Sequence, residues 1–166
     1  MGAAQLNEGL NLQHTDCVVE AAKAVFGTAC GIQIEPSQAD SDAHTDGVIF
    51  AVISLVGDVE WSVFLGLPRG TATATAARFA GFDIPFDSDD MGDAVGELTN
   101  ILAGHVKALL DKRGLRAEIS LPSVVRAENL AVLNRRDLQV AKTCFNSELG
   151  NLWAGVTFGT RRGFAS

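Results

Sequence analysis

The chain has 166 residues, of which 47% are hydrophobic and 20% are charged, and its formal net charge is −7. This balance is typical of one globular domain with a sizeable core, and it excludes a disordered chain. An acidic chain without a basic stripe argues against nucleic-acid binding, and no apolar run approaches the roughly 20 residues of a membrane span. We therefore expect a single domain over residues 1–166 that binds neither nucleic acid nor membrane.

The cysteines and the first residues indicate the compartment. Cys17, Cys30 and Cys144 are odd in number and lack the spacing of a metal site, so we interpret them as small apolar core residues in a reducing environment. The opening residues lack the charged and then apolar layout of a signal peptide. We expect a cytoplasmic protein.

The first elements are expected to be a helix and a short strand. Residues 1–13 have no clear pattern and are expected to be irregular and loose. An apolar helical face begins near Thr15, and Gly27 or Gly31 would end that helix. Residues 32–35 alternate as a short strand does, and Pro36 would stop it.

Residues 36–47 form an acidic stretch in which potential metal ligands alternate, namely Asp40, Asp42, His44 and Asp46. The pattern does not fit a calcium loop, because Thr45 and Ala51 stand where that loop has glycine and glutamate. Asp87 and Asp89 fail in the same way, with Leu98 at the twelfth position. We interpret both stretches as solvated acidic segments and expect no metal.

The next two elements are a hairpin and a helix. Val48–Val56 and Val59–Leu65 are rich in β-branched and aromatic residues and flank a Gly-Asp turn, which predicts a β-hairpin. The first run is almost continuously apolar, so we expect a central strand covered on both faces. Residues 70–82 alternate threonine and alanine as a strand could, but the alanines and Gly81 favour a helix with a glycine C-cap.

The clearest periodicity in the chain lies in residues 87–114. Asp and Ser residues at its start favour a helix N-terminus, and Lys112, Arg113 and Gly114 favour a C-terminus. Between them an apolar stripe recurs at three- and four-residue steps, which predicts one long amphipathic helix. The stripe consists of Val95, Leu98, Leu102, Val106 and Leu109, with Ile101 and His105 beside it.

The opposite face of this helix carries a second stripe, formed by Asp93, Glu97, Asn100, Gly104, Lys107 and Asp111. Glu97 and Asn100 are three residues apart and therefore neighbours on the surface. Gly96 and Gly104 each cost about 1 kcal/mol of helix stability relative to alanine, and small residues would let another backbone approach. The alternative is an ordinary solvated face with tolerated glycines.

Familiar catalytic motifs are absent. The chain has no GxSxG, no HExxH, no P-loop and no dinucleotide fingerprint. We interpret His105 as a core histidine rather than a base, and His14 and His44, in expected loops, receive no role.

The last third of the chain, residues 115–166, is expected to consist mainly of strands. Leu115–Leu121 is expected to be a strand, with Pro122 at an edge, at a bulge or just past it. Residues 126–137 are expected to be a loop, Leu138–Phe145 and Leu152–Phe158 a second hairpin, and residues 159–166 loose. The fold class is then α+β: a mostly antiparallel sheet of about six strands, packed by two long helices and an N-terminal helix.

The segment from Asp93 to Gly104 resembles the signature helix of the CheC/CheX chemotaxis phosphatases. That signature has Asp or Ser, then Glu four residues on, then Asn three residues on, which Asp93, Glu97 and Asn100 match. A proline follows the asparagine in the signature, and Pro122 resembles it although 21 intervening residues are one fewer than usual. The chain carries one ExxN site, which favours the CheX-like branch.

The resemblance implies a phosphatase that hydrolyses the aspartyl phosphate of a CheY-like receiver domain. In it, Asn100 would position the attacking water and Glu97 would dock to the receiver lysine. Gly96 and Gly104 would let the helix insert at the receiver, Asp93 and Pro122 would support the site, and the Lys107 ammonium would offset acidic charge locally. The residues expected to support the site are thus Asp93, Gly96, Gly104, Lys107 and Pro122.

The resemblance also implies a homodimer, with an edge near Pro122 or the last hairpin as the candidate seam. The protein would need no cofactor of its own, because the receiver supplies the magnesium ion. Two alternatives remain: a catalytically silent binding module for a receiver or another chemotaxis protein, and a structural role like that of flagellar-switch relatives.

Overall fold

The computed structural model describes residues 3–38, 46–131 and 135–159, with no side-chain detail for residues 3–13. Its helical elements are α1 (Ala3–Val25), a π-helical turn (Phe26–Cys30), α2 (Arg69–Ala80) and α3 (Asp89–Asp111). Its strands are β1 (Ile34–Ser37), β2 (Val48–Gly57), β3 (Glu60–Pro68), β4 (Ala117–Ile119), β5 (Ser123–Ala127), β6 (Leu138–Ser147) and β7 (Leu152–Gly159).

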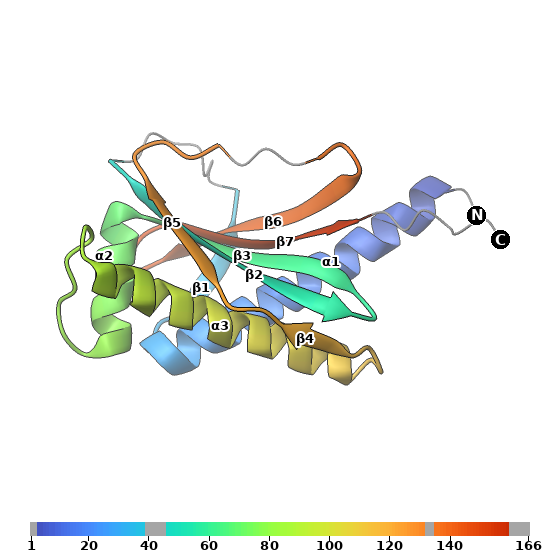
Figure 1. The fold of residues 1–166 in the computed structure, drawn as a ribbon, viewed down its shortest axis with the longest axis horizontal. Helices are drawn as coiled ribbons and strands as arrows, with labels where there is room; N and C mark the ends of the chain where they lie inside the picture. Colours follow the sequence, from blue (N-terminus) through green and yellow to red (C-terminus); the bar gives the residue numbers. More distant parts are fainter. Residues whose placement is uncertain (1–2, 39–45, 132–134, 160–166) are drawn as a thin grey trace.

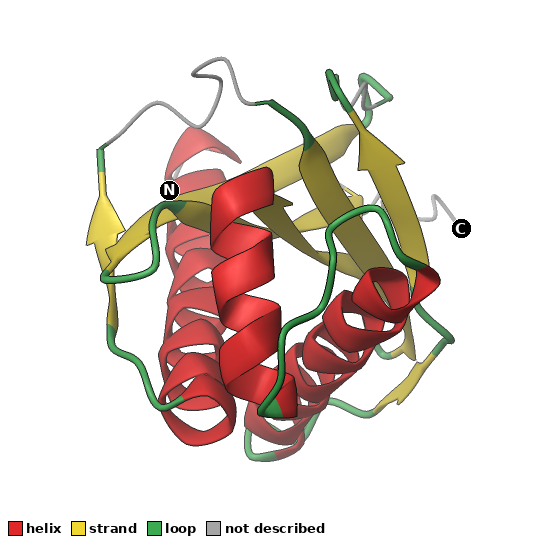
Figure 2. Ribbon diagram, turned by 90° about the vertical axis from the view of Figure 1, so that its left-hand side faces the viewer, coloured by secondary structure: helices red, strands yellow, loops and turns green. Residues whose placement is uncertain are grey.

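The molecule has two layers, a seven-stranded sheet and a layer of three helices on one of its faces (Figures 1 and 2). The strand order is β1-β6-β7-β3-β2-β4, β5 also pairs with β2, and every pairing is antiparallel. The predicted α+β class is confirmed, with seven strands where about six were expected.

The first hairpin is confirmed as β2 and β3, and β2 is an interior strand, paired with β3 on one side and with β4 and β5 on the other, although it lies second from the end of the sheet. Its covering differs from the prediction, however. Ile49, Ala51 and Ile53 are almost fully buried, whereas Phe50 and Val52, which point to the opposite face, are half-buried. The helix layer covers only one face of the sheet, and an antiparallel sheet tolerates a partly solvated second face.

Two predictions near the N-terminus are wrong. Residues 3–13, expected to be irregular, belong to α1. Once the following turns are fixed by packing against the sheet and α3, each further residue adds a hydrogen bond at little cost, so the helix propagates toward the N-terminus. Pro36 lies inside β1 rather than ending it. Proline has no N–H to donate, but β1 is an edge strand, where this is tolerated.

A histidine and two cysteines in or just after α1 are buried. His14, expected in a loop, lies in the helix and is buried; its ring stacks on Phe158, with the centroids 3.8 Å apart, and is tilted against Trp61, with the centroids 4.6 Å apart. Cys17 and Cys30 are buried as predicted, and burial raises the pKa of Cys30 to about 11. A thiol held protonated in this way behaves as a small apolar group.

The remaining predictions on elements are mostly confirmed. The helix expected within residues 70–82 is α2, which begins one residue earlier at Arg69 and has Gly81 as its left-handed C-cap, and the last hairpin is β6 and β7. Asp40, Asp42 and His44 lie outside the described residues. No helix in the described part of the chain is both long and apolar enough to cross a membrane.

Candidate functional site

The predicted long helix is α3, and one face of it is anchored in the core. Val95, Leu98, Leu102 and Val106 are at most 2% exposed. At the last turn the buried residue is Leu110 and not the predicted Leu109, which is half-buried. The helix is therefore fixed in its rotation about its own axis, and its opposite face must point away from the sheet.

The N-terminus of α3 lacks the side-chain hydrogen bond of a capped helix. Ser88 occupies the N-cap position with extended backbone, but its hydroxyl donates to the Pro85 carbonyl at 2.7 Å and does not accept a helix N–H. Asp89 and Asp90 stand in the first turn, where carboxylates suit the helix dipole. Gly114, with φ of +76°, reverses the chain after the helix.

The outward face presents the predicted pair. Asp93, Glu97 and Asn100 are all exposed, at successive turns. Between the last two, Leu98 and Thr99 are buried, and the Thr99 hydroxyl donates to the Val95 carbonyl at 2.7 Å. Glu97 and Asn100 thus project side by side from a helix that cannot turn, with a carboxylate and an amide available to a partner.

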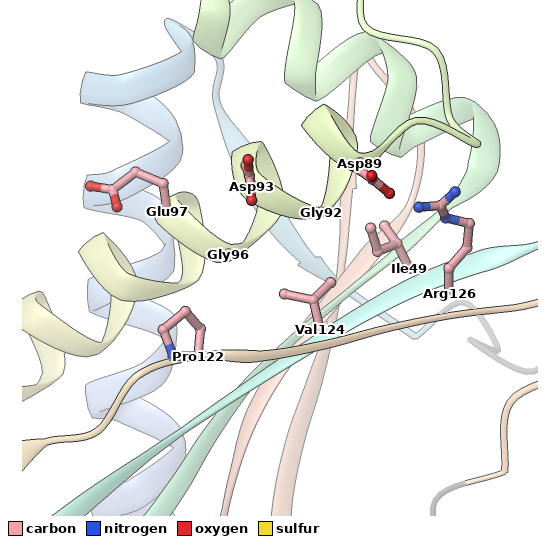
Figure 3. A pocket seen from close by; sticks show the side chains of 9 residues that line it. All are labelled: Ile49, Asp89, Gly92, Asp93, Gly96, Glu97, Pro122, Val124 and Arg126. Atoms are coloured by element: carbon pink, nitrogen blue, oxygen red, sulfur yellow. The ribbon is translucent and has the colours of Figure 1, made fainter.

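An open groove runs beside Glu97 toward the start of α3 (Figure 3). One wall is the first half of α3 and the other is β5 with the residue before it, and Ile49 of β2 lies between them. The lining residues are Ile49, Asp89, Gly92, Asp93, Gly96, Glu97, Pro122, Val124 and Arg126. The structure therefore brings Asp93, Gly96, Glu97 and Pro122 together, whereas Asn100, Gly104 and Lys107 are not among the residues that line this groove.

The two glycines predicted to admit a partner have different surroundings. Gly96 is buried, and a Cβ added there would stand 3.4 Å from Val124 Cγ2 and 3.6 Å from Pro122 Cγ. Its small size serves the contact between α3 and β5 of the same chain. At Gly104 an added Cβ would meet nothing within 4 Å, so this glycine leaves open space on the face that carries Asn100.

Pro122 lies at a β-bulge between β4 and β5, which is one of the positions that the sequence predicted for it. Ile119 pairs with Leu55 and Ser123 with Val52, so residues 120–122 oppose only residues 53–54. Bulges often lie beside functional sites, where they redirect the chain. Here the bulge brings the Pro122 ring against Gly96 and beside Glu97.

The charges of the groove are mostly carboxylates. Asp89, Asp93 and Glu97 make no ion pair with any described residue. Lys107, predicted to offset acidic charge, has its Nζ 3.3 Å from Asp111 Oδ2, so that part of its charge is already balanced. No three acidic, cysteine or histidine side chains converge as metal ligands within residues 14–38, 46–131 and 135–159, whose side chains the structure describes.

Arg126 is the basic residue among those that line the groove, and sequence reasoning gave it no role. It donates from Nη2 to the Ser88 carbonyl at 3.0 Å, and its guanidinium lies 5.9 Å from the Phe86 ring centroid. Arg69 packs on the same ring at 4.1 Å and pairs with Asp87, whose pKa this hydrogen bond and charge lower. Arg126 belongs to the expected loop over residues 126–137, and only the pairing of β5 with β2 places it here.

Comparison with known proteins identifies relatives of this fold. The family model described as chemotaxis phosphatase CheX matches residues 49–146. A CheX crystal structure from Desulfovibrio desulfuricans is 25% identical and superposes with a TM-score of 0.72 over 87% of this chain and 97% of that chain. A chemotaxis protein from Desulfovibrio vulgaris Hildenborough is also 25% identical, with a TM-score of 0.74 over 87% and 95% of the two chains.

A third structure is the CheX–CheY–BeF3–Mg complex of Borrelia burgdorferi. Its CheX chain is 18% identical to this one, with a TM-score of 0.68 over 87% of this chain and 96% of that chain, which shows a shared fold. No curated protein sequence matches the chain significantly.

Proposed function

Since the chain belongs to the CheX family of chemotaxis phosphatases, we propose that it hydrolyses the aspartyl phosphate of a CheY-like receiver domain. The observation that carries this proposal is the exposed pair Glu97 and Asn100, held side by side on a helix whose other face is anchored in the core. The Borrelia CheX was crystallised with CheY, which supports a receiver as the partner of the shared fold.

Asn100 is the group that positions the attacking water. An aspartyl phosphate is already a reactive acyl phosphate, so catalysis depends on placing a water in line with phosphorus. A neutral amide offers both a donor and an acceptor and adds no negative charge beside the phosphoryl group. Because Leu98 and Thr99, the two residues before Asn100, are buried, the amide approaches the receiver on a rigid support.

Glu97 is the docking group. Its carboxylate has no ion-pair partner among the described residues and is therefore available to the lysine of a receiver active site. The magnesium ion belongs to the receiver, and this chain contributes no cofactor. Asp93, one turn earlier, and Pro122, across the groove, support the position of Glu97.

The test is the decay of phosphate on purified receivers of the same genome, phosphorylated by a small donor in magnesium. We expect wild-type protein to accelerate decay and Asn100→Ala to lose about 10²-fold or more of that acceleration. Asn146→Ala is the matched control, since Asn146 is an exposed asparagine on β6. Glu97→Ala should mainly raise KM, because Glu97 acts in docking.

Each other outcome has a definite meaning. Acceleration that survives in Asn100→Ala would retain the phosphatase but remove Asn100 as the water-positioning residue. Binding of receivers without accelerated decay of any of them would favour the catalytically silent binding module. If no receiver binds, the proposal of a receiver partner is lost altogether.

A further inference from the structure

Leu121 is a large apolar side chain at the edge of the groove, next to Pro122 in the chain, and it is left in solvent. It is 89% exposed, the highest value for a large hydrophobic residue in the described part of the chain, where the next is Phe82 at 63%. Its neighbour Pro122 lines the groove together with Glu97. Nothing within the protein's own core explains a leucine at this position.

The backbone at Leu121 is nevertheless held in place. The Ser120 N–H donates to the Ser54 carbonyl at 2.9 Å, and the Ser54 N–H donates to the Ser120 hydroxyl oxygen at 3.0 Å. That hydroxyl in turn donates to the Leu121 carbonyl at 3.0 Å. The Ser120 side chain thereby replaces a ladder bond that the bulge removes, and it fixes the residue that follows.

An apolar side chain on a fixed backbone loses less entropy when a partner covers it than one on a mobile loop, because only its rotamers remain to be ordered. We propose that Leu121 is a hydrophobic anchor for the receiver domain, which it contacts outside the catalytic pair and so contributes to affinity and to the choice of receiver. This inference rests on the proposed function, because it takes the partner docked at Glu97 and Asn100 as the occupant.

Geometry supports that occupant. A standard interface buries about 800 Å² on each partner, equivalent to a disc of roughly 16 Å radius. The Pro122 ring lies 3.6 Å from the Cβ position of Gly96, next to Glu97, and the Leu121 Cα is about 3.8 Å from the Pro122 Cα. An interface of ordinary size centred on Glu97 and Asn100 therefore extends to the backbone position of Leu121.

A second copy of the chain fits this spot less well. Strand pairing across an edge needs a regular row of N–H and C=O groups. At residues 120–122 the row is broken by the bulge, and Pro122 has no N–H. The break hinders the addition of a strand, while it leaves the leucine side chain accessible to a partner.

The experiment compares wild type with Leu121→Ala, Leu121→Met and Val140→Ala. Two quantities are measured for each: the steady-state KM and kcat for a phosphorylated receiver, and the direct binding of the beryllofluoride-activated receiver in magnesium. We expect Leu121→Ala to raise KM and the dissociation constant about ten-fold with kcat unchanged. Leu121→Met, which keeps the apolar surface, should stay within about two-fold.

Val140→Ala is the matched control, an exposed apolar residue on β6, four strands away from β5 in the sheet. It should change neither KM nor the dissociation constant. The melting temperature should be unaffected by Leu121→Ala, since truncating a side chain that is 89% exposed removes no core contact.

Several results would overturn the inference. These are an unchanged dissociation constant in Leu121→Ala, a fall in kcat at constant KM, or an equal effect of Val140→Ala. A lower melting temperature or a changed molecular mass in light scattering would assign Leu121 to the protein's own fold or to a second copy. Binding is measured separately from hydrolysis. If the wild-type protein binds the receiver without dephosphorylating it, the proposed phosphatase activity is refuted, but the binding data still test the role of Leu121.

Discussion

Replacing Gly104 by alanine should make the protein more stable and less active. Glycine costs about 1 kcal/mol relative to alanine inside a helix, and a Cβ at Gly104 would meet nothing within 4 Å. No clash offsets the gain, so the full difference in helix propensity should be realised. For a chain of this length, about 1 kcal/mol corresponds to a rise of roughly 2–4 °C in the melting temperature.

Activity should move in the opposite direction. Gly104 lies one turn beyond Asn100 on the same face of α3, where the proposed receiver main chain approaches. A methyl group there holds the two backbones apart, and a displacement of about 1 Å in a catalytic geometry can cost roughly 10²-fold. We expect the rate of receiver dephosphorylation to fall at least about ten-fold.

The assay pairs thermal denaturation with phosphate decay on the cognate receiver. Gly70→Ala is the matched control, because Gly70 is an exposed glycine of α2 whose added Cβ also meets nothing within 4 Å. Gly70→Ala should leave dephosphorylation unchanged. If Gly104→Ala raised the melting temperature without slowing dephosphorylation, Gly104 would be a tolerated surface glycine and the reasoning about close approach would be refuted.

Three further predictions concern the fold. A Cβ at Gly155 would collide with the Ala141 carbonyl and the Phe64 ring, so Gly155→Ala should lower the free energy of unfolding by about 2 kcal/mol or more in urea denaturation; an unchanged midpoint would contradict this packing. Arg69 lowers the pKa of folded Asp87, so the ion pair stabilises above the unfolded pKa and is lost as pH falls through the folded one. Asp87→Asn should therefore melt slightly lower at pH 7 but not at pH 2, and an equal deficit at both would refute the linkage. Light scattering should give the mass of a homodimer, and a monomer at micromolar concentration would remove that expectation.

The sequence by itself determined the features that depend on local periodicity. The apolar stripe from Val95 to Val106 fixed both the existence of α3 and the face it turns outward, because burial of one face decides where the other points. That Glu97 and Asn100 project side by side follows directly, since residues three apart on a helix are neighbours on its surface. The hairpin of β2 and β3 was equally readable, since turn chemistry and β-branched residues act over short range.

Only the tertiary structure decided what lies opposite that helix. The pairing of β5 with β2 brings Pro122 and Arg126 across the groove, and the bulge leaves Leu121 exposed at its rim. The tertiary structure also gives the two glycines of α3 different surroundings: Gly96 packs against β5, and Gly104 faces open space. Contacts between segments more than twenty residues apart depend on strand register and layer packing, which no local pattern encodes, and so the helix could be predicted from its own residues while its surroundings could not.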